Sequence, residues 1–241
     1  MSEEPATQLS RQDQLDEAID EYTKAIELDS TDAAAYYGRG LAWAEKDEFG
    51  KAVEDYTKAA ELAPEDATVY YKRGVAWQML GELDNAVDDY GQAIELEPSN
   101  ARAYNNRGIV RQRQDKVDDA IEDYSKAIEL DPADAVAYNN RGFAWQEMGE
   151  FDNALEDYSK AIELNPEDVV AYTNRGFIWR VKGDQLKDKA IEDLSKAIEI
   201  DPSYAAAYRN RGYAWQEKGA DYNAMVDFKK AEELDPRLRD E

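Results

Sequence analysis

An arginine directly precedes a glycine at six places in the chain. An aspartate follows each of these arginines at a position that is equivalent in every copy of a repeating pattern. A guanidinium group keeps its charge, and its planar fork of N–H donors matches a carboxylate. A charged group at a helix–helix contact needs such a partner. We therefore predict a ladder of ion pairs, within each repeat or to the repeat before it; the alternative is that the arginines bind an anion. The pairs are Arg39 and Asp55, Arg73 and Asp89, Arg107 and Asp123, Arg141 and Asp157, Arg175 and Asp193, and Arg211 and Asp227.

Other chemistry is largely missing from the sequence. The 241 residues include no cysteine and no histidine. Thiol chemistry, disulfides, Cys/His zinc sites and the usual neutral-pH base are therefore excluded. No phosphate-binding loop, nucleophile elbow or calcium-binding loop occurs either. We expect a protein that is not an enzyme and that has no catalytic residues, no metal and no cofactor.

The net charge of -25 argues against two classes of partner. Nucleic acids and anionic membrane surfaces both require a basic patch. No apolar run approaches the roughly 20 residues that span a bilayer. The first residues lack the basic end and apolar core of a secretory signal. We expect a soluble, cytoplasmic protein, or one interaction domain of a longer chain.

The glycines of the Arg–Gly pairs give the chain its period. The first five are 34 residues apart and the last step is 36. Each period predicts two helices, the first with an aromatic residue, Arg–Gly and then tryptophan, the second with a stripe such as Phe151, Ala154, Tyr158 and Ile162. Pro166 ends that second helix. Asp32, Asp66, Asn100, Asp134 and Asp168 stand where the next first helix needs an N-cap.

A period of this length predicts a stack of small helical units. We divide the chain into a partial or degenerate first repeat at 1–32, six full repeats and a tail at 239–241. Two extra residues within 183–188 predict a lengthened turn in one repeat. The full repeats are 33–66, 67–100, 101–134, 135–168, 169–204 and 205–238.

This pattern resembles the tetratricopeptide repeat (TPR) over essentially the whole chain, in its period and in its order of Trp, Gly, Tyr, Ala and Pro. The resemblance implies an all-α fold, a right-handed α-solenoid, or superhelix, of antiparallel helix pairs. It also implies that the first helices line a concave groove. The chain departs from the family where arginine replaces the usual core leucine before the glycine.

The resemblance places three kinds of residue on the wall of that groove. Asparagines before the arginine could grip an extended peptide, because each amide offers both a donor and an acceptor. Alternatively, these amides bond only helix neighbours or water. Apolar residues after the glycine and nearby basic residues complete the predicted site. The predicted peptide-binding residues are Asn106, Asn140, Asn174, Asn210, Ile109, Phe143, Phe177, Tyr213, Lys72, Arg113, Arg180 and Arg209.

One repeat differs at the tryptophan position. Trp43, Trp77, Trp145, Trp179 and Trp215 have the spacing of core residues. The 101–134 repeat has Arg111 instead, within a basic cluster of Arg107, Arg111, Arg113 and Lys116. This substitution predicts either a weaker packing layer or a local anion site.

The function that we predict is that of a protein–protein interaction scaffold, with an extended peptide or a partner protein of unknown identity bound in the groove. The alternative is a self-assembling scaffold, in which uncapped repeat ends join head to tail. The asparagine required directly after the glycine for clamping a C-terminal carboxylate, as in co-chaperone TPRs, is absent, and Tyr37 replaces the expected lysine.

Overall fold

The structure is a computed structural model that describes residues 10–240, with side chains through Leu238. Within that range it is all helical, with thirteen α-helices, two short 3₁₀ helices and no strand. The part of the predicted partial repeat in residues 1–9, and Glu241 of the predicted tail, lie outside the described residues.

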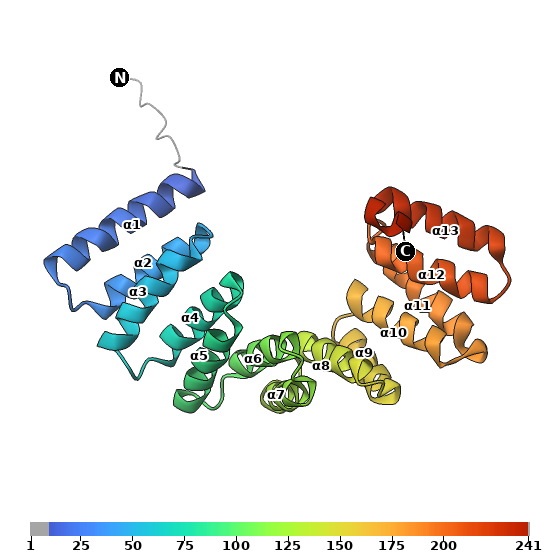
Figure 1. Ribbon diagram of the computed structural model, residues 1–241, viewed down its shortest axis with the longest axis horizontal. Helices are drawn as coiled ribbons and strands as arrows, with labels where there is room; N and C mark the ends of the chain where they lie inside the picture. The colour runs from blue at the N-terminus through green and yellow to red at the C-terminus, as the bar shows by residue number, and fades with distance from the viewer. Residues whose placement is uncertain (1–9, 241) are drawn as a thin grey trace, which may run out of the picture. The chain divides into compact units, whose positions relative to one another are not determined.

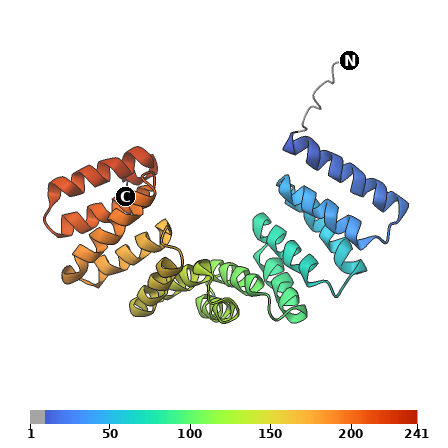
Figure 2. The ribbon, with the colours of Figure 1, turned by 180° about the vertical axis from the view of Figure 1, so that it is seen from behind.

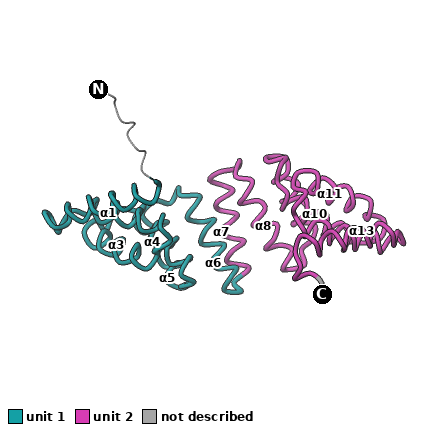
Figure 3. The backbone as a smooth tube through the Cα atoms, turned by 90° about the horizontal axis from the view of Figure 1, so that it is seen from above, with its two compact units in different colours: residues 1–116 teal, residues 117–241 magenta. Residues whose placement is uncertain are grey.

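The chain separates into two compact units, residues 1–116 and 117–241 (Figure 3). In unit 1, each of the helices α1 to α6 packs on the next. Those helices are α1 (Arg11–Leu28), α2 (Ala33–Glu45), α3 (Phe49–Leu62), α4 (Ala67–Leu80), α5 (Leu83–Leu96) and α6 (Ala101–Arg113).

Unit 2 is built in the same way, with α7 to α13 packed in chain order (Figures 1 and 2). The two units together confirm the predicted all-α solenoid of antiparallel helix pairs. The helices of unit 2 are α7 (Val117–Leu130), α8 (Ala135–Glu147), α9 (Phe151–Leu164), α10 (Val169–Lys182), η1 (Asp184–Leu186), α11 (Lys187–Ile200), α12 (Ala205–Glu217), α13 (Asp221–Leu234) and η2 (Pro236–Asp240).

The ends of the first helices follow from local chemistry. The Asp134 carboxylate accepts the backbone N–H groups of Val136 and Ala137. The other four predicted caps also accept a backbone N–H, which confirms the prediction. At the other end, the turns at Gly81, Gly149 and Gly219 have φ between 76° and 80°. Asp47 and Asp115 adopt the same left-handed conformation in two turns without glycine, because aspartate tolerates it better than most residues.

Glycine permits the close contact inside each helix pair. A Cβ atom added at Gly142 would lie 2.9 Å from the ring of Tyr158, closer than real Cβ contacts. Gly40, Gly74 and Gly212 meet an aromatic ring in the same way. Alanines fill the rest of the interface, for example Ala154, which is fully buried. Each pair is therefore held at a separation that one added methyl group would increase.

One expectation needs correction. The tryptophans were expected in the core, but Trp43, Trp77, Trp145 and Trp179 pack half-buried against its edge. After the last second helix, the short 3₁₀ helix η2 packs against α13. The lengthened turn predicted within 183–188 contains the three-residue 3₁₀ helix η1.

Candidate functional site

The Arg–Gly arginines make the same contacts in both units. Arg141 Nε donates to Oδ2 of Asp157 at 2.8 Å, and its Nη2 donates to Oδ1 at 2.7 Å. Its Nη1 donates to Oγ of Ser125, on the preceding second helix, at 3.1 Å. Equivalent three-way contacts join Arg39 to Asp55 and Thr23, Arg73 to Asp89 and Thr57, Arg175 to Asp193 and Ser159, and Arg211 to Asp227 and Ser195.

These contacts explain how the arginines are tolerated. Asp157 is only 3% exposed, and burial raises the pKa of its carboxyl, a rise that the hydrogen bonds from Arg141 oppose. The same hydrogen bonds raise the pKa of Arg141. Each of these five arginines thus donates hydrogen bonds to two neighbouring helices, which favours a structural role over anion binding. Arg107 is in unit 1 and Asp123 is in unit 2, so that pair remains a prediction.

The asparagines of the predicted groove lie next to buried tyrosines. The Tyr90 hydroxyl donates to Oε1 of Gln78 at 2.8 Å, and Nδ2 of Asn106 donates to the Tyr71 hydroxyl at 3.1 Å. Burial raises the pKa of Tyr90, and a side-chain hydrogen bond from Asn106 opposes that rise. The Asn106 amide is therefore partly engaged inside unit 1.

The same arrangement recurs in unit 2. The Tyr158 hydroxyl donates to Oε1 of Gln146 at 3.0 Å. Burial raises the pKa of Tyr158 as well, again opposed by a hydrogen bond from the next asparagine, Asn174. A tyrosine, a glutamine of its own repeat and an asparagine of the next repeat thus form a set, which we call the Tyr–Gln–Asn set. For Asn106 and Asn174, the structure favours the alternative of bonding to helix neighbours.

The 169–204 repeat lacks this set. Leu194 replaces the tyrosine and lies against Gly176 as Tyr158 lies against Gly142. Arg180 replaces the glutamine. The asparagine of the next repeat, Asn210, consequently has no side-chain hydrogen bond to any residue that the structure describes, whereas its counterpart Asn174 bonds Tyr158. Asn210 is therefore the predicted groove asparagine best able to bond a ligand.

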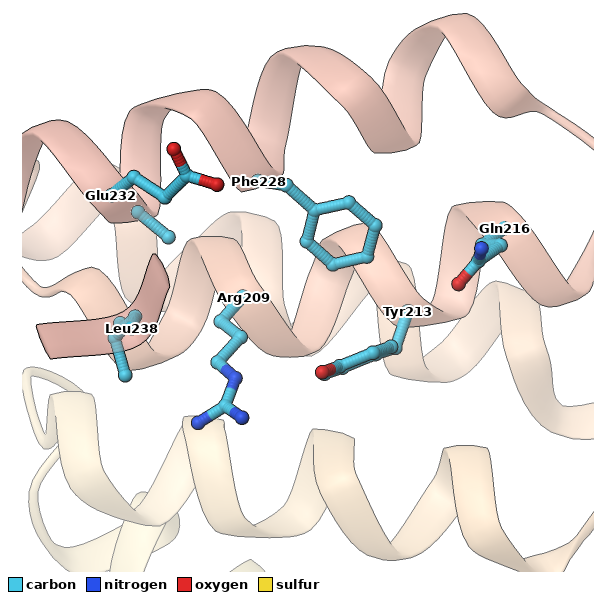
Figure 4. A pocket seen from close by; sticks show the side chains of 7 residues that line it. Arg209, Tyr213, Gln216, Phe228, Glu232 and Leu238 are labelled. Carbon is cyan, nitrogen blue, oxygen red and sulfur yellow. The ribbon is translucent and has the colours of Figure 1, made fainter. Parts of the chain in front are cut away.

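Two adjoining cavities surround Tyr213 at this point of unit 2, and we call them together the Tyr213 pocket. They share Arg209, Tyr213 and Leu238 and have volumes of about 290 and about 350 Å³. Figure 4 shows the first cavity, where the rings of Tyr213 on α12 and Phe228 on α13 meet edge to face. Their centroids are 5.0 Å apart. The second cavity is lined by Phe177, Arg180, Ala205, Ala206, Arg209, Asn210, Tyr213, Asp235 and Leu238.

Arg180 is held in place by rings and one carboxylate. Its guanidinium carbon is 5.3 Å from the Phe177 ring centroid and 5.4 Å from that of Tyr213. Its Nη1 donates to Oε1 of Glu217 at 2.7 Å. Its Nε is buried and has no hydrogen-bond partner within the described residues. Arg209 also lies over the Tyr213 ring, at 5.8 Å. Positive and negative groups thus occur together in the pocket, since Asp235 and Glu232 line it too.

The structure brings together Phe177, Arg180, Arg209, Asn210 and Tyr213 of the predicted site. Phe143 is exposed on α8 and Asn140 lies on the same helix, while Asn174 lies on α10. Lys72 on α4, and Asn106, Ile109 and Arg113 on α6, belong to unit 1.

Sequence analysis missed Leu238 and Phe228, both of which line the Tyr213 pocket. It also missed the exposed Val136 and Val170. The sequence did contain one indication of the pocket, since the 169–204 repeat has lost both the tyrosine and the glutamine, which are replaced by Leu194 and Arg180.

Metal sites and membrane-spanning helices are both absent from the described part of the chain. Residues 10–240 include no cluster of acidic side chains arranged to hold a metal ion. No helix among them combines the length and the apolar character needed to cross a bilayer.

Comparisons with known proteins agree with the repeat pattern. The tetratricopeptide repeat family matches residues 101–134 and 135–168, and a second TPR repeat family matches 9–47, 44–81, 79–115 and 188–219. A comparison with curated proteins gives no match.

Solved structures of TPR proteins are similar to the chain. MamA is 31% identical over 71% of this chain and 92% of its own, with a TM-score of 0.63. YrrB, described as a TPR protein with an unusual peptide-binding site, is 27% identical over 77% of this chain and 96% of its own, with a TM-score of 0.63. A TPR protein from Parabacteroides merdae shares the fold at 20% identity, over 93% of this chain and 90% of its own, with a TM-score of 0.70. From the repeats, the helix pairs and these matches, we conclude that the chain belongs to the tetratricopeptide repeat family.

Proposed function

We propose that this chain is a protein-interaction scaffold that binds an extended peptide segment along the first helices of unit 2, with one side chain of the peptide in the Tyr213 pocket. Scaffolding of protein interactions is the general role of TPR proteins. The observation that carries the more specific proposal is the amide of Asn210, which has no partner among the described side chains and lies beside a pocket lined by Phe177 and Tyr213.

The chemistry of the pocket favours a peptide over a small anion. Arg180 already donates to Glu217, and Asp235 and Glu232 add negative charge to the lining. A neutral peptide backbone requires instead one donor and one acceptor, which a single amide supplies. The aromatic walls give an apolar side chain of the peptide a surface to cover.

The apolar surface continues along the first helices of unit 2. Val136 and Phe143 on α8 and Val170 on α10 are all exposed. An extended peptide spans about 3.3 Å per residue, so a segment of several residues could contact more than one repeat. The similarity to YrrB, which is described as a TPR protein with an unusual peptide-binding site, agrees with this role.

The test is a binding selection with a matched control. A library of random peptides displayed on phage is selected on the whole chain, and the enriched peptides are measured by fluorescence anisotropy. We expect Asn210→Ala to weaken binding by about tenfold, because it removes one to two hydrogen bonds to the peptide. Asn174→Ala, at the equivalent position but bonded to Tyr158, is expected to change affinity much less.

Two results would contradict the proposal. One is the failure of the selection to enrich any peptide. The other is equal binding of the enriched peptides to wild type and Asn210→Ala.

The alternative, head-to-tail assembly, has less support at the end of unit 2. Ser195 accepts a hydrogen bond from Arg211 of the next repeat, but Lys229 occupies the equivalent position in the last repeat. Glu232 replaces the isoleucine of the two preceding repeats, Ile162 and Ile198. A further TPR placed on α13 would therefore meet two charges where the internal interfaces have a hydroxyl and an apolar side chain.

A further inference from the structure

The last second helix, α13, departs from a pattern that most of its counterparts keep on their exposed surface; the other exception is α3, which has Gly50 at the first position and keeps Glu54 at the second. The second helices of the two preceding repeats carry an acidic pair one turn apart, Asp152 with Glu156 and Asp188 with Glu192. The pairs Asp84 with Asp88 and Asp118 with Glu122 occur at the same points earlier in the chain. In α13 these two positions are Tyr222 and Val226. In a chain with a net charge of -25, the loss of both acids at one helix requires an explanation.

Together with Met225, these residues form an apolar surface, which we call the α13 patch. Tyr222 is 73% exposed, Met225 59% and Val226 47%. Their i, i+3, i+4 spacing places them on one side of the helix. Met225 itself takes a position that is buried in earlier repeats, as shown by Leu155. An exposed apolar surface of this kind marks a contact with another molecule.

We propose that the α13 patch binds the α13 patch of a second copy of the chain, with the two helices antiparallel about a two-fold axis. An isologous contact requires a surface that is complementary to itself. If Met225 of one copy faces Val226 of the other, then Tyr222 lies opposite Lys229 of the second copy.

The charges of α13 agree with this register. The ammonium group of Lys229 would meet the face of the tyrosine ring, an attractive contact. The same register sets Asp221 opposite Lys230, which pairs opposite charges on both sides of the axis. A parallel arrangement would instead place Asp221 beside Asp221 and Lys230 beside Lys230. The antiparallel pair is therefore the arrangement that the helix favours.

The contact is small, so the dimer is weak and closed. One helix per copy buries less than the roughly 1,200 Å² of a standard stable interface. The repulsion between two chains of net charge -25 opposes association and is screened by salt, whereas the apolar contact is not. Association should therefore strengthen as salt is added and stop at two copies. This inference is independent of peptide binding, because the α13 patch does not include Asn210 or Arg180.

Single cysteines give a direct test, since the chain has none of its own. Val226→Cys places a thiol next to the proposed axis, and Glu192→Cys places one at the equivalent exposed position of the preceding repeat. Under a mild oxidant, we expect Val226→Cys to form a covalent dimer at least about tenfold faster, because the contact raises the effective thiol concentration. Equal rates for the two variants would overturn the proposal.

Sedimentation over a concentration series in high salt gives a second readout. Wild type is expected to pass from monomer to dimer and no further. Tyr222→Asp with Val226→Glu restores the acidic pair of the preceding repeats. This double variant should keep its fold, which circular dichroism checks, and should no longer form the dimer. Asn85→Asp with Asn153→Asp adds the same charge at exposed sites away from α13 and should dimerise as wild type does. A wild type that stays monomeric, or oligomers that persist in the α13 double variant, would overturn the proposal.

Discussion

The Tyr158 hydroxyl donates a hydrogen bond to Oε1 of Gln146 in the same repeat, at 3.0 Å. Gln146 thus accepts the proton of a buried hydroxyl, whose oxygen accepts a hydrogen bond from Asn174. In the next repeat, both partners change together, to Leu194 and Arg180. The aliphatic side chain needs no partner, so Arg180 is directed instead to Glu217 and the two aromatic rings. A coordinated change in the interior thus creates a distinct surface at the Tyr213 pocket.

The first prediction concerns the ion pair of Arg141 and Asp157. Arg141→Leu should lower the free energy of unfolding by about 3–5 kcal/mol, because it leaves a buried carboxylate without its partner. Urea denaturation followed by circular dichroism measures the change. Arg141→Leu with Asp157→Leu should recover most of the loss, since neither charge then remains. A single variant as stable as wild type would show that the pair is not needed to hold Asp157.

The features that could be predicted from the sequence are those that recur in each repeat. The helix pairs, N-caps and Arg–Asp spacing depend on local periodicity that recurs in each repeat, so comparing the repeats revealed them. The Tyr213 pocket depends on Leu238, the last residue of the sixth repeat, which lies in η2, packed against α13. Because the equivalent positions of the three preceding repeats are Asp134, Asp168 and Tyr204, comparing the repeats did not predict a leucine that lines a pocket. The hydrogen bonds of Asn106 and Asn174 to tyrosines could not be predicted, because the sequence is equally consistent with amides that bind a peptide and with amides that bond neighbouring helices.

The second prediction compares two glycines in helices. Gly142→Ala should lower the free energy of unfolding by about 1–3 kcal/mol, because the added Cβ overlaps the Tyr158 ring. Gly50→Ala adds a Cβ that meets nothing within 4 Å, in the first turn of α3. It should raise the free energy of unfolding by a few tenths to about 1 kcal/mol through helix propensity. Thermal unfolding of both variants checks the signs, and a stabilised Gly142→Ala would contradict the close packing.

The third prediction concerns alkaline pH. Burial raises the pKa values of Tyr56, Tyr90, Tyr124 and Tyr158 above the ordinary value near 10. Above about pH 10 the unfolded chain therefore loses protons that the folded chain keeps, so the free energy of unfolding falls as pH rises. Below about pH 9 this contribution is fully present, and with no histidine we expect little change down to about pH 6.

Urea denaturation at a series of pH values measures that alkaline loss, and phenolate absorbance reports which tyrosines titrate. Tyr158→Phe removes one contributor and should make the fall above pH 10 shallower. A stability that rises between pH 10 and 11 would contradict the burial of these hydroxyls.

The most direct test of the central claim is to restore the Tyr–Gln–Asn set at the Tyr213 pocket. Leu194→Tyr with Arg180→Gln gives the 169–204 repeat the residues of the preceding repeat, and it supplies Asn210 with a hydroxyl partner. The measurement is the affinity of a selected peptide for this variant, by fluorescence anisotropy, with folding checked by circular dichroism. The account predicts a folded variant that binds the peptide at least about tenfold more weakly than wild type. Unchanged affinity in the folded variant would show that the altered repeat does not make the binding site.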